Sequence, residues 1–221
     1  MIVRETIPQD STKADIRLYL TTNINSIPAL GPDKDEARES TMKTILDKSS
    51  ECFLWARLVL QELRRVHTAA EVRQVLEDIP SDMDELYMRI LNSMSTFPYG
   101  KRLTKAILTW TVCSARPLTA EELYYALQID VNDNIDSVQR SIASSCGQLV
   151  YVDASSRVQM VHQTACDFLL RSDNKSEFAI DKKEGYKRLA MRKHNRQRAL
   201  SFCVVCVQLA VESCRLGIIA R

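Results

Sequence analysis

Residues 147–170 read GQLVYVDASSRVQMVHQTACDFLL and carry the strongest β-strand pattern in the chain. Residues 149–152 and 158–161 are short runs rich in apolar and β-branched side chains, which favour strands. The polar stretch 153–157 between them has the length and chemistry of a hairpin loop. This pattern predicts one two-stranded β-hairpin in a chain whose other patterns are helical.

A helix is expected to begin directly after the second strand. Thr164 fits an N-cap, and Asp167 three residues later makes a weaker form of the capping box. His162 would then lie between the strand and the helix N-terminus, where free backbone N–H groups favour anions. This position makes His162 the candidate site residue of the chain.

The composition indicates an ordinary globular protein. Of 221 residues, 45% are hydrophobic and 26% are charged, which is usual for a soluble domain. Only five glycines occur, and this favours long helices over a β-sandwich or a nucleotide-binding α/β fold. The seven cysteines are scattered through apolar patterns, as expected for reduced thiols in an intracellular, cytoplasmic protein. Neither a signal peptide nor a membrane-spanning run of about 18–20 apolar residues is expected.

The remaining sequence predicts helices. Residues 52–63 are apolar on most sides, so this helix should be central to a bundle. Thr68-x-x-Glu71 is a full capping box, and Ser81 or Asp82 is expected to cap the next helix. The turn 97–100 is the predicted domain boundary. Beyond it, the expected helices are 103–115, 120–128 (with the capping box Thr119-x-x-Glu122) and 134–146.

Three helices followed by a two-stranded wing is the order of a winged helix. We therefore predict a mainly α protein, in which a helical bundle precedes a winged-helix domain with a small two-stranded β-wing. The predicted regions are a helical subdomain over 32–97, the winged-helix domain over 98–171 and a basic helical tail over 172–221, preceded by a linker or domain edge over 1–31.

Several segments, in this order along the chain, carry a family resemblance. They are FLWA (53–56), VRQVL (72–76), IP (79–80), LYMRIL (86–91), ILTW (107–110), RPLTAEEL (116–123), VHQT (161–164) and DFL (167–169). Over about residues 12–171 they resemble the region that follows the NACHT nucleotide-binding core in fungal STAND-type NTPases, which are large intracellular switch proteins. The last part resembles the winged-helix module named after GPI inositol-deacylase. By this resemblance, residues 1–31 would be the remnant edge of a NACHT core or a linker.

The resemblance implies a role without catalysis. The chain has no Gly-x-x-x-x-Gly-Lys-Ser/Thr phosphate loop and no Gly-x-Ser-x-Gly nucleophile elbow, so no catalytic residue, metal ligand or cofactor of its own is expected. In related switch NTPases, a histidine of a Met-His-Asp-like motif contacts the ADP phosphates. The stretch 160–163, Met-Val-His-Gln, resembles that motif, and this implies that His162 contacts an ADP phosphate when a NACHT core is present. The alternative is a histidine that bonds a neighbouring carbonyl and pins the strand–helix junction.

Two function hypotheses follow. The first is a non-catalytic regulatory or interaction module of a NACHT/STAND-type signalling NTPase. Its partner would be a NACHT-type core or another protein, with no small-molecule substrate. The second is a nucleic-acid or membrane-surface adaptor that acts through the basic run 182–198. Residues 181–221 hold ten Lys/Arg against three Asp/Glu, although the whole chain carries only +2. A solvated helix leading to an apolar helix at 199–211 is the structural alternative for this tail.

A third possibility is that the winged helix reads DNA through its third helix, 134–146. That helix carries Arg140 as its one base and Asp136 as its one acid. Without an excess of positive charge, it is expected to bind phosphates poorly.

Overall fold

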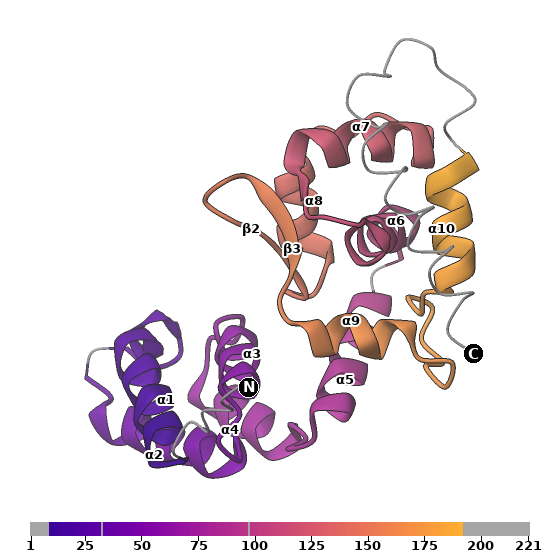
Figure 1. The fold of residues 1–221 in the computed structure, drawn as a ribbon. Helices are drawn as coiled ribbons and strands as arrows, with labels where there is room; N and C mark the ends of the chain where they lie inside the picture. Colours follow the sequence, from indigo (N-terminus) through magenta and orange to yellow (C-terminus); the bar gives the residue numbers. More distant parts are fainter. Residues whose placement is uncertain (1–8, 32, 97, 192–221) are drawn as a thin grey trace, which may run out of the picture. The chain divides into compact units, whose positions relative to one another are not determined.

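The computed structural model describes residues 9–31, 33–96 and 98–191. The contacts divide the chain into two compact units, Met1–Leu86 and Tyr87–Arg221, and each is described by itself (Figure 1). The described residues form ten α-helices and a small antiparallel sheet, which confirms the mainly α prediction. The division falls inside one helix, α5 (Met83–Ser95).

The first unit is a small helical bundle built around α3. Its helices are α1 (Gln9–Asn23), α2 (Asp35–Lys48), α3 (Phe53–Leu63), α4 (Ala69–Asp78) and the start of α5, with a short 3-10 helix at Ile24–Ser26. Six side chains of α3 are buried, which confirms its predicted central position. Trp55 is fully buried, and its indole N–H donates to the carbonyl of Pro80 at 2.8 Å.

The helix ends of this unit follow local sequence signals. The capping box of α4 is formed: the Thr68 hydroxyl accepts from the Glu71 N–H at 3.2 Å, and the Glu71 carboxylate accepts from the Thr68 N–H at 2.8 Å. Asp82, rather than Ser81, caps α5, because its carboxylate accepts from the N–H groups two and three residues later. At the other end of α4, Lys48 donates to the carbonyl of Leu76.

In the second unit, helices precede and follow the hairpin along the chain. They are α6 (Lys101–Cys113), α7 (Ala120–Val131), α8 (Val138–Ser145), α9 (Gln163–Leu170) and α10 (Lys182–Met191), with the later part of α5. The Thr119–Glu122 capping box of α7 is formed as predicted. α8 is shorter than the predicted 134–146, because Ser137 has an extended backbone and its hydroxyl accepts from the Arg140 N–H.

The sheet has three strands in the order β1-β3-β2. β2 (Val150–Val152) and β3 (Arg157–Met160) form the predicted hairpin, with Val150 opposite Met160. The wing was predicted to have two strands, but β1 (Leu118–Thr119) adds a third by pairing with the other edge of β3. A strand of two residues is too short to show the alternation of apolar and polar residues that predicts strands. In addition, the sequence around Thr119 has a helix-capping pattern, which predicts the start of a helix and not a strand.

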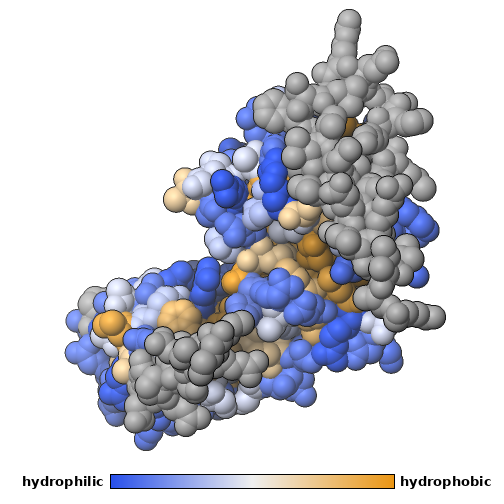
Figure 2. Space-filling view, in the orientation of Figure 1, coloured by the Kyte–Doolittle hydropathy of each residue, from blue (hydrophilic) through white to orange (hydrophobic). Residues whose placement is uncertain are grey.

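Hydrophilic side chains cover much of the visible surface, and hydrophobic ones show in smaller areas (Figure 2). The exposed large hydrophobic residues of the described part are Leu18, Phe53, Tyr99, Tyr125 and Tyr151. No helix within residues 9–31, 33–96 and 98–191 combines the length and the apolar character that a membrane crossing needs.

Candidate site at the start of α9

His162 is the N-cap of α9. The prediction that Thr164 has this role is wrong, because the helix begins two residues earlier than expected. The backbone at His162 is extended (φ −163°, ψ 156°), and its ring Nδ1 accepts from the Thr164 N–H at 3.2 Å. Its carbonyl accepts from the Ala165 N–H at 3.2 Å. The hairpin pairing continues to Val161, whose N–H donates to the carbonyl of Leu149 at 2.8 Å, so the chain leaves the sheet at His162 and the helix starts at the next residue.

Two hydroxyl groups lead from the interior of the unit to this imidazole. The hydroxyl of Tyr87 on α5 lies 2.8 Å from Oγ1 of Thr164, and that oxygen lies 2.9 Å from Nδ1 of His162. Tyr87 is buried, and its ring lies 5.4 Å from the ring of Phe168. A nitrogen that accepts hydrogen bonds carries no proton, so the neutral ring holds its proton on Nε2.

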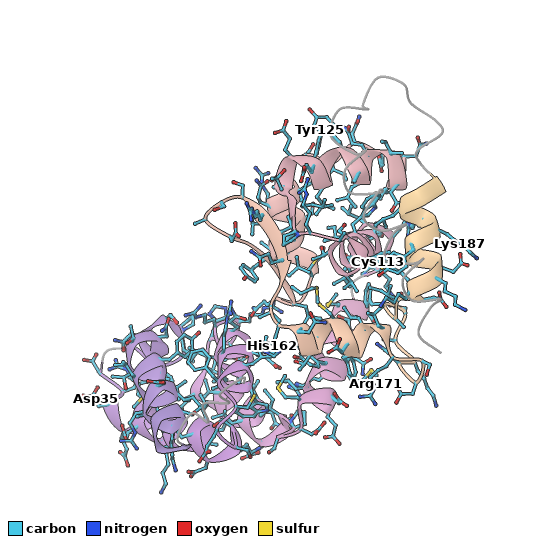
Figure 3. The ribbon with its side chains drawn as sticks, in the orientation of Figure 1. Asp35, Cys113, Tyr125, His162, Arg171 and Lys187 are labelled. Carbon is cyan, nitrogen blue, oxygen red and sulfur yellow. The ribbon has the colours of Figure 1, made fainter. Side chains whose placement is uncertain are left out.

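The Nε2 side of His162 is therefore a hydrogen-bond donor. The residue is exposed at the N-terminal end of α9 (Figure 3), and no described residue bonds Nε2. A helix N-terminus also favours an anion through its backbone N–H groups. Gln163, which replaces the acid of the Met-His-Asp-like motif, donates to Asp167 at 2.9 Å and so is bonded within α9.

In the alternative interpretation, the ring of His162 bonds a neighbouring carbonyl. The structure shows a different hydrogen-bond partner. The imidazole bonds an amide and a hydroxyl of Thr164, and in this way it does pin the strand–helix junction. The cap explains the local conformation. It does not test the phosphate contact of Nε2, which stays a prediction.

Cysteine chemistry does not extend this site. The Cys166 thiol, one turn after His162, points to the carbonyl oxygen of His162 at 3.8 Å, not to the imidazole. Burial, and then the nearby Asp167 carboxylate, raise the pKa of Cys166, which disfavours the thiolate that a nucleophile requires. No group of three or more His, Cys, Asp or Glu in the described part of the chain could hold a metal ion.

The third helix, α8, offers little to a DNA backbone. Its exposed residues are Gln139, Arg140, Ala143 and Ser144, and only one of them is cationic. This agrees with the expectation that the helix binds phosphates poorly.

The basic run 182–198 is described only as far as Met191. Within α10, Lys187 pairs with Glu184 at 2.5 Å, and Arg188 reaches Asp130 of α7 at 2.8 Å. Asp130 is buried and also accepts from the indole N–H of Trp110 at 2.9 Å. Local sequence patterns do not reveal the role of this carboxylate, since its partners lie 20 and 58 residues away along the chain. The rest of the basic run and the predicted apolar helix 199–211 lie outside the described residues, so the adaptor hypothesis stays a prediction.

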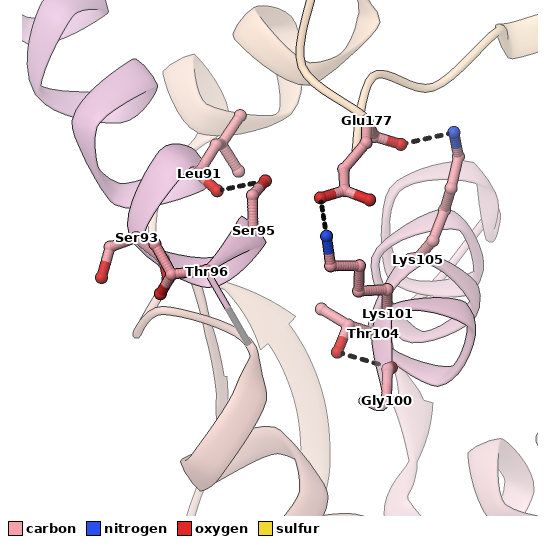
Figure 4. A network of polar contacts seen from close by, with 9 residues as sticks. All are labelled: Leu91, Ser93, Ser95, Thr96, Gly100, Lys101, Thr104, Lys105 and Glu177. Atoms are coloured by element: carbon pink, nitrogen blue, oxygen red, sulfur yellow. Dashed lines mark hydrogen bonds and ion pairs between the residues drawn. The ribbon is translucent and has the colours of Figure 1, made fainter. Parts of the chain in front are cut away.

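The segment between α9 and α10 is fixed to the second unit. Lys101 donates to the Glu177 carboxylate at 2.8 Å, and Lys105 donates to the Glu177 carbonyl at 2.7 Å (Figure 4). Phe178 and Ile180 are buried. These contacts end at Ile180, two residues before α10 begins.

Residues 91–181 match the family model of the GPI inositol-deacylase winged helix domain. No curated protein and no solved structure matches the chain. The match covers the end of α5, the helices α6 to α9, the three strands and the segment that Glu177 fixes. The chain thus contains a winged-helix domain, and His162 lies inside it, directly after the wing.

Proposed function

We propose that this chain is the non-catalytic, regulatory part of a NACHT/STAND-type signalling NTPase that acts in the cytoplasm. The proposal rests on one observation: within the matched winged-helix domain, His162 caps the helix that follows the wing. The partner would be a NACHT-type nucleotide-binding core. The chain would need neither a catalytic residue nor a cofactor of its own.

The proposed mechanism is a contact that exists only in the closed state. The Nε2–H of His162 would donate to a phosphate oxygen of ADP held by the core, and the first N–H groups of α9 would add to the attraction. Such a contact shifts the closed–open equilibrium by about 1–3 kcal/mol. Thr164 would hold the ring in the tautomer that can donate.

The test uses a fusion that places a NACHT core ahead of residue 1 and measures the release of a fluorescent ADP analogue. His162→Ser keeps an N-cap oxygen but removes the Nε2 donor. We expect ADP release to become about 5- to 150-fold faster. His67→Ser is the matched control, because His67 is also an exposed histidine but lies outside the winged-helix match. Unchanged release in the His162→Ser protein would reject the phosphate contact.

A further inference from the structure

Tyr87 brings a buried hydroxyl group to the first turn of α9. Tyr87 is 1% exposed, whereas Thr164 and His162 are both exposed. The Tyr87 hydroxyl oxygen lies 2.8 Å from Oγ1 of Thr164, and Oγ1 lies 2.9 Å from Nδ1 of His162. The Tyr87 ring also lies beside the buried ring of Phe168, with 5.4 Å between the ring centroids. Tyr87 therefore reaches the His162 site from inside the domain.

The direction of each hydrogen bond in this chain of groups follows from the Thr164 amide. A backbone N–H can only donate, and this one donates to Nδ1 of His162 at 3.2 Å. Because Nδ1 then carries no proton, its contact with Oγ1 needs the Thr164 hydroxyl as the donor. That hydroxyl has a single proton, so its contact with Tyr87 needs the tyrosine as the donor. The hydrogen bonds thus run from Tyr87 through Thr164 to His162, and the ring keeps its own proton on Nε2.

The opposite tautomer of His162 would reverse this order. With a proton on Nδ1, the ring would donate to the Thr164 hydroxyl, and the Thr164 N–H would face an N–H group instead of a lone pair. Tyr87 opposes the reversal, because it donates to the Thr164 oxygen and leaves the hydroxyl proton for the ring. Successive hydrogen bonds that point the same way also polarise and strengthen one another. Removing the Tyr87 hydroxyl should therefore weaken the preference for the Nε2–H tautomer.

We propose that Tyr87 is a positioning residue of the His162 site: its hydroxyl, acting through Thr164, holds the imidazole in the tautomer whose Nε2–H can donate to an anion. Tyr87 belongs to α5, whose first four residues belong to the other unit, so the relay joins this shared helix to the site. The use of the donor in ADP retention rests on the proposed function. The control of the ring by Tyr87 does not.

The tautomer of His162 can be measured in the full chain without a nucleotide. Long-range proton–nitrogen correlation NMR at about pH 8, where free imidazole groups are neutral, shows which ring nitrogen carries the proton. The signals of His162 are those that disappear in His162→Ser. Wild type should carry the proton on Nε2. Tyr87→Phe keeps the ring that packs on Phe168, and it should raise the ratio of Nδ1–H to Nε2–H by about 2- to 12-fold, the factor for one net hydrogen bond.

Two further variants complete this measurement. Thr164→Val removes the hydroxyl through which Tyr87 acts, so it should change the ratio at least as much and decides the test if Tyr87→Phe does not fold. Tyr124→Phe is the matched control, because the Tyr124 hydroxyl accepts from Gln128 within α7 at 2.7 Å, and it should leave the ratio unchanged. A wild-type ring protonated on Nδ1, or an unchanged ratio in both relay variants, would overturn the proposal.

The fusion with a NACHT core separates the relay from the proposed function. There, Tyr87→Phe should speed ADP release by less than His162→Ser does, and it should add less than about twofold in the His162→Ser background, because both changes act through the same ring. If His162→Ser leaves release unchanged, the phosphate contact is rejected and the tautomer ratio alone decides the relay. If His162→Ser speeds release but Tyr87→Phe does not, Tyr87 does not serve the site and the proposal is overturned.

Discussion

Gly147 has a backbone conformation and a packing environment that both require glycine. Its φ is +56°, and a Cβ atom there would lie 2.5 Å from Sδ of Met94 and 2.7 Å from Cγ2 of Ile90. A left-handed backbone with a side chain costs about 1–2 kcal/mol, and overpacking adds about 1–3 kcal/mol. We therefore expect Gly147→Ala to lower the free energy of unfolding of the second unit by about 2–5 kcal/mol, measured by urea titration.

Gly100 separates these two contributions. Its φ is +81°, but no atom lies within 4 Å of its Cβ position. Gly100→Ala should therefore cost only the backbone part, about 1–2 kcal/mol. Equal losses at the two glycines would show that the contacts with α5 add nothing.

Glu122 makes the stability of the second unit depend on pH. Its carboxylate accepts from both terminal nitrogens of Arg116, at 2.9 and 2.6 Å, and from the Thr119 N–H at 2.9 Å. The Arg116 guanidinium holds the pKa of Glu122 below its usual value of 4.5. A carboxyl group whose pKa falls on folding stabilises the folded state. This stabilisation is complete at pH values above the unfolded pKa, and it is lost as the pH falls through the folded pKa.

Glu122→Gln keeps the capping box but removes the charge. At neutral pH it should lower the free energy of unfolding by about 1–2 kcal/mol. At about pH 3 the difference from wild type should be much smaller. Glu121→Gln, an exposed neighbour in the same helical turn, is the control. Urea titration at both pH values measures this difference in unfolding free energy. A difference that is as large at about pH 3 as at neutral pH would contradict this account.

Local signals explain which residues could be predicted. The sequence showed that His162 stands between a strand and a helix, because the alternation and the polar loop are local patterns. It could not show that the ring itself is the cap, because this depends on where the chain leaves the sheet. Asp130 was missed altogether, since its partners come from α6 and α10.

Among the elements, helices with capping boxes were predicted best. The boxes at Thr68 and Thr119 each join groups three residues apart, so they need no tertiary contact. β1 exists only because β3 pairs with it, and the sequence alone therefore could not reveal it. The docking of α10 is likewise tertiary: its basic composition predicted a tail, whereas Gly185 and Arg188 fix it on the domain.

α8 allows a direct test of DNA reading. A helix that reads DNA loses about 1–3 kcal/mol of binding free energy when a base-contacting arginine is removed. Because Arg140 is the only exposed cation of α8, we expect Arg140→Ala to change the affinity for duplex DNA by less than about twofold. Fluorescence anisotropy at low salt measures this. A loss of about tenfold would instead identify α8 as a recognition helix.

At the scale of the whole molecule, turn residues and side-chain packing divide the chain at different points. The turn at 97–100 was the predicted boundary, and the contacts divide at Leu86 and Tyr87, within α5. Turn residues show where the backbone changes direction, but only the fold shows which side chains pack together. The other predicted regions, 1–31, 32–97, 98–171 and 172–221, stay predictions.

α5 contributes buried residues to both units. Leu86 is fully buried and belongs to the first unit, whereas Leu91 is fully buried and belongs to the second. Proline inside a helix removes a hydrogen bond and clashes with the preceding turn, at a cost of about 3 kcal/mol or more. Met88→Pro, near the middle of α5, should therefore speed hydrogen exchange in both α3 and α6.

Met83→Pro is the matched control for this test. Met83 is the first residue of α5, after its cap Asp82, and proline is tolerated at that position because its N–H has no partner within the helix. Exchange in α3 and α6 should stay close to wild type, apart from the lost methionine packing. If Met88→Pro speeds exchange in one unit alone, the continuous helix is not what stabilises both, and each unit must then hold its own part of α5 independently.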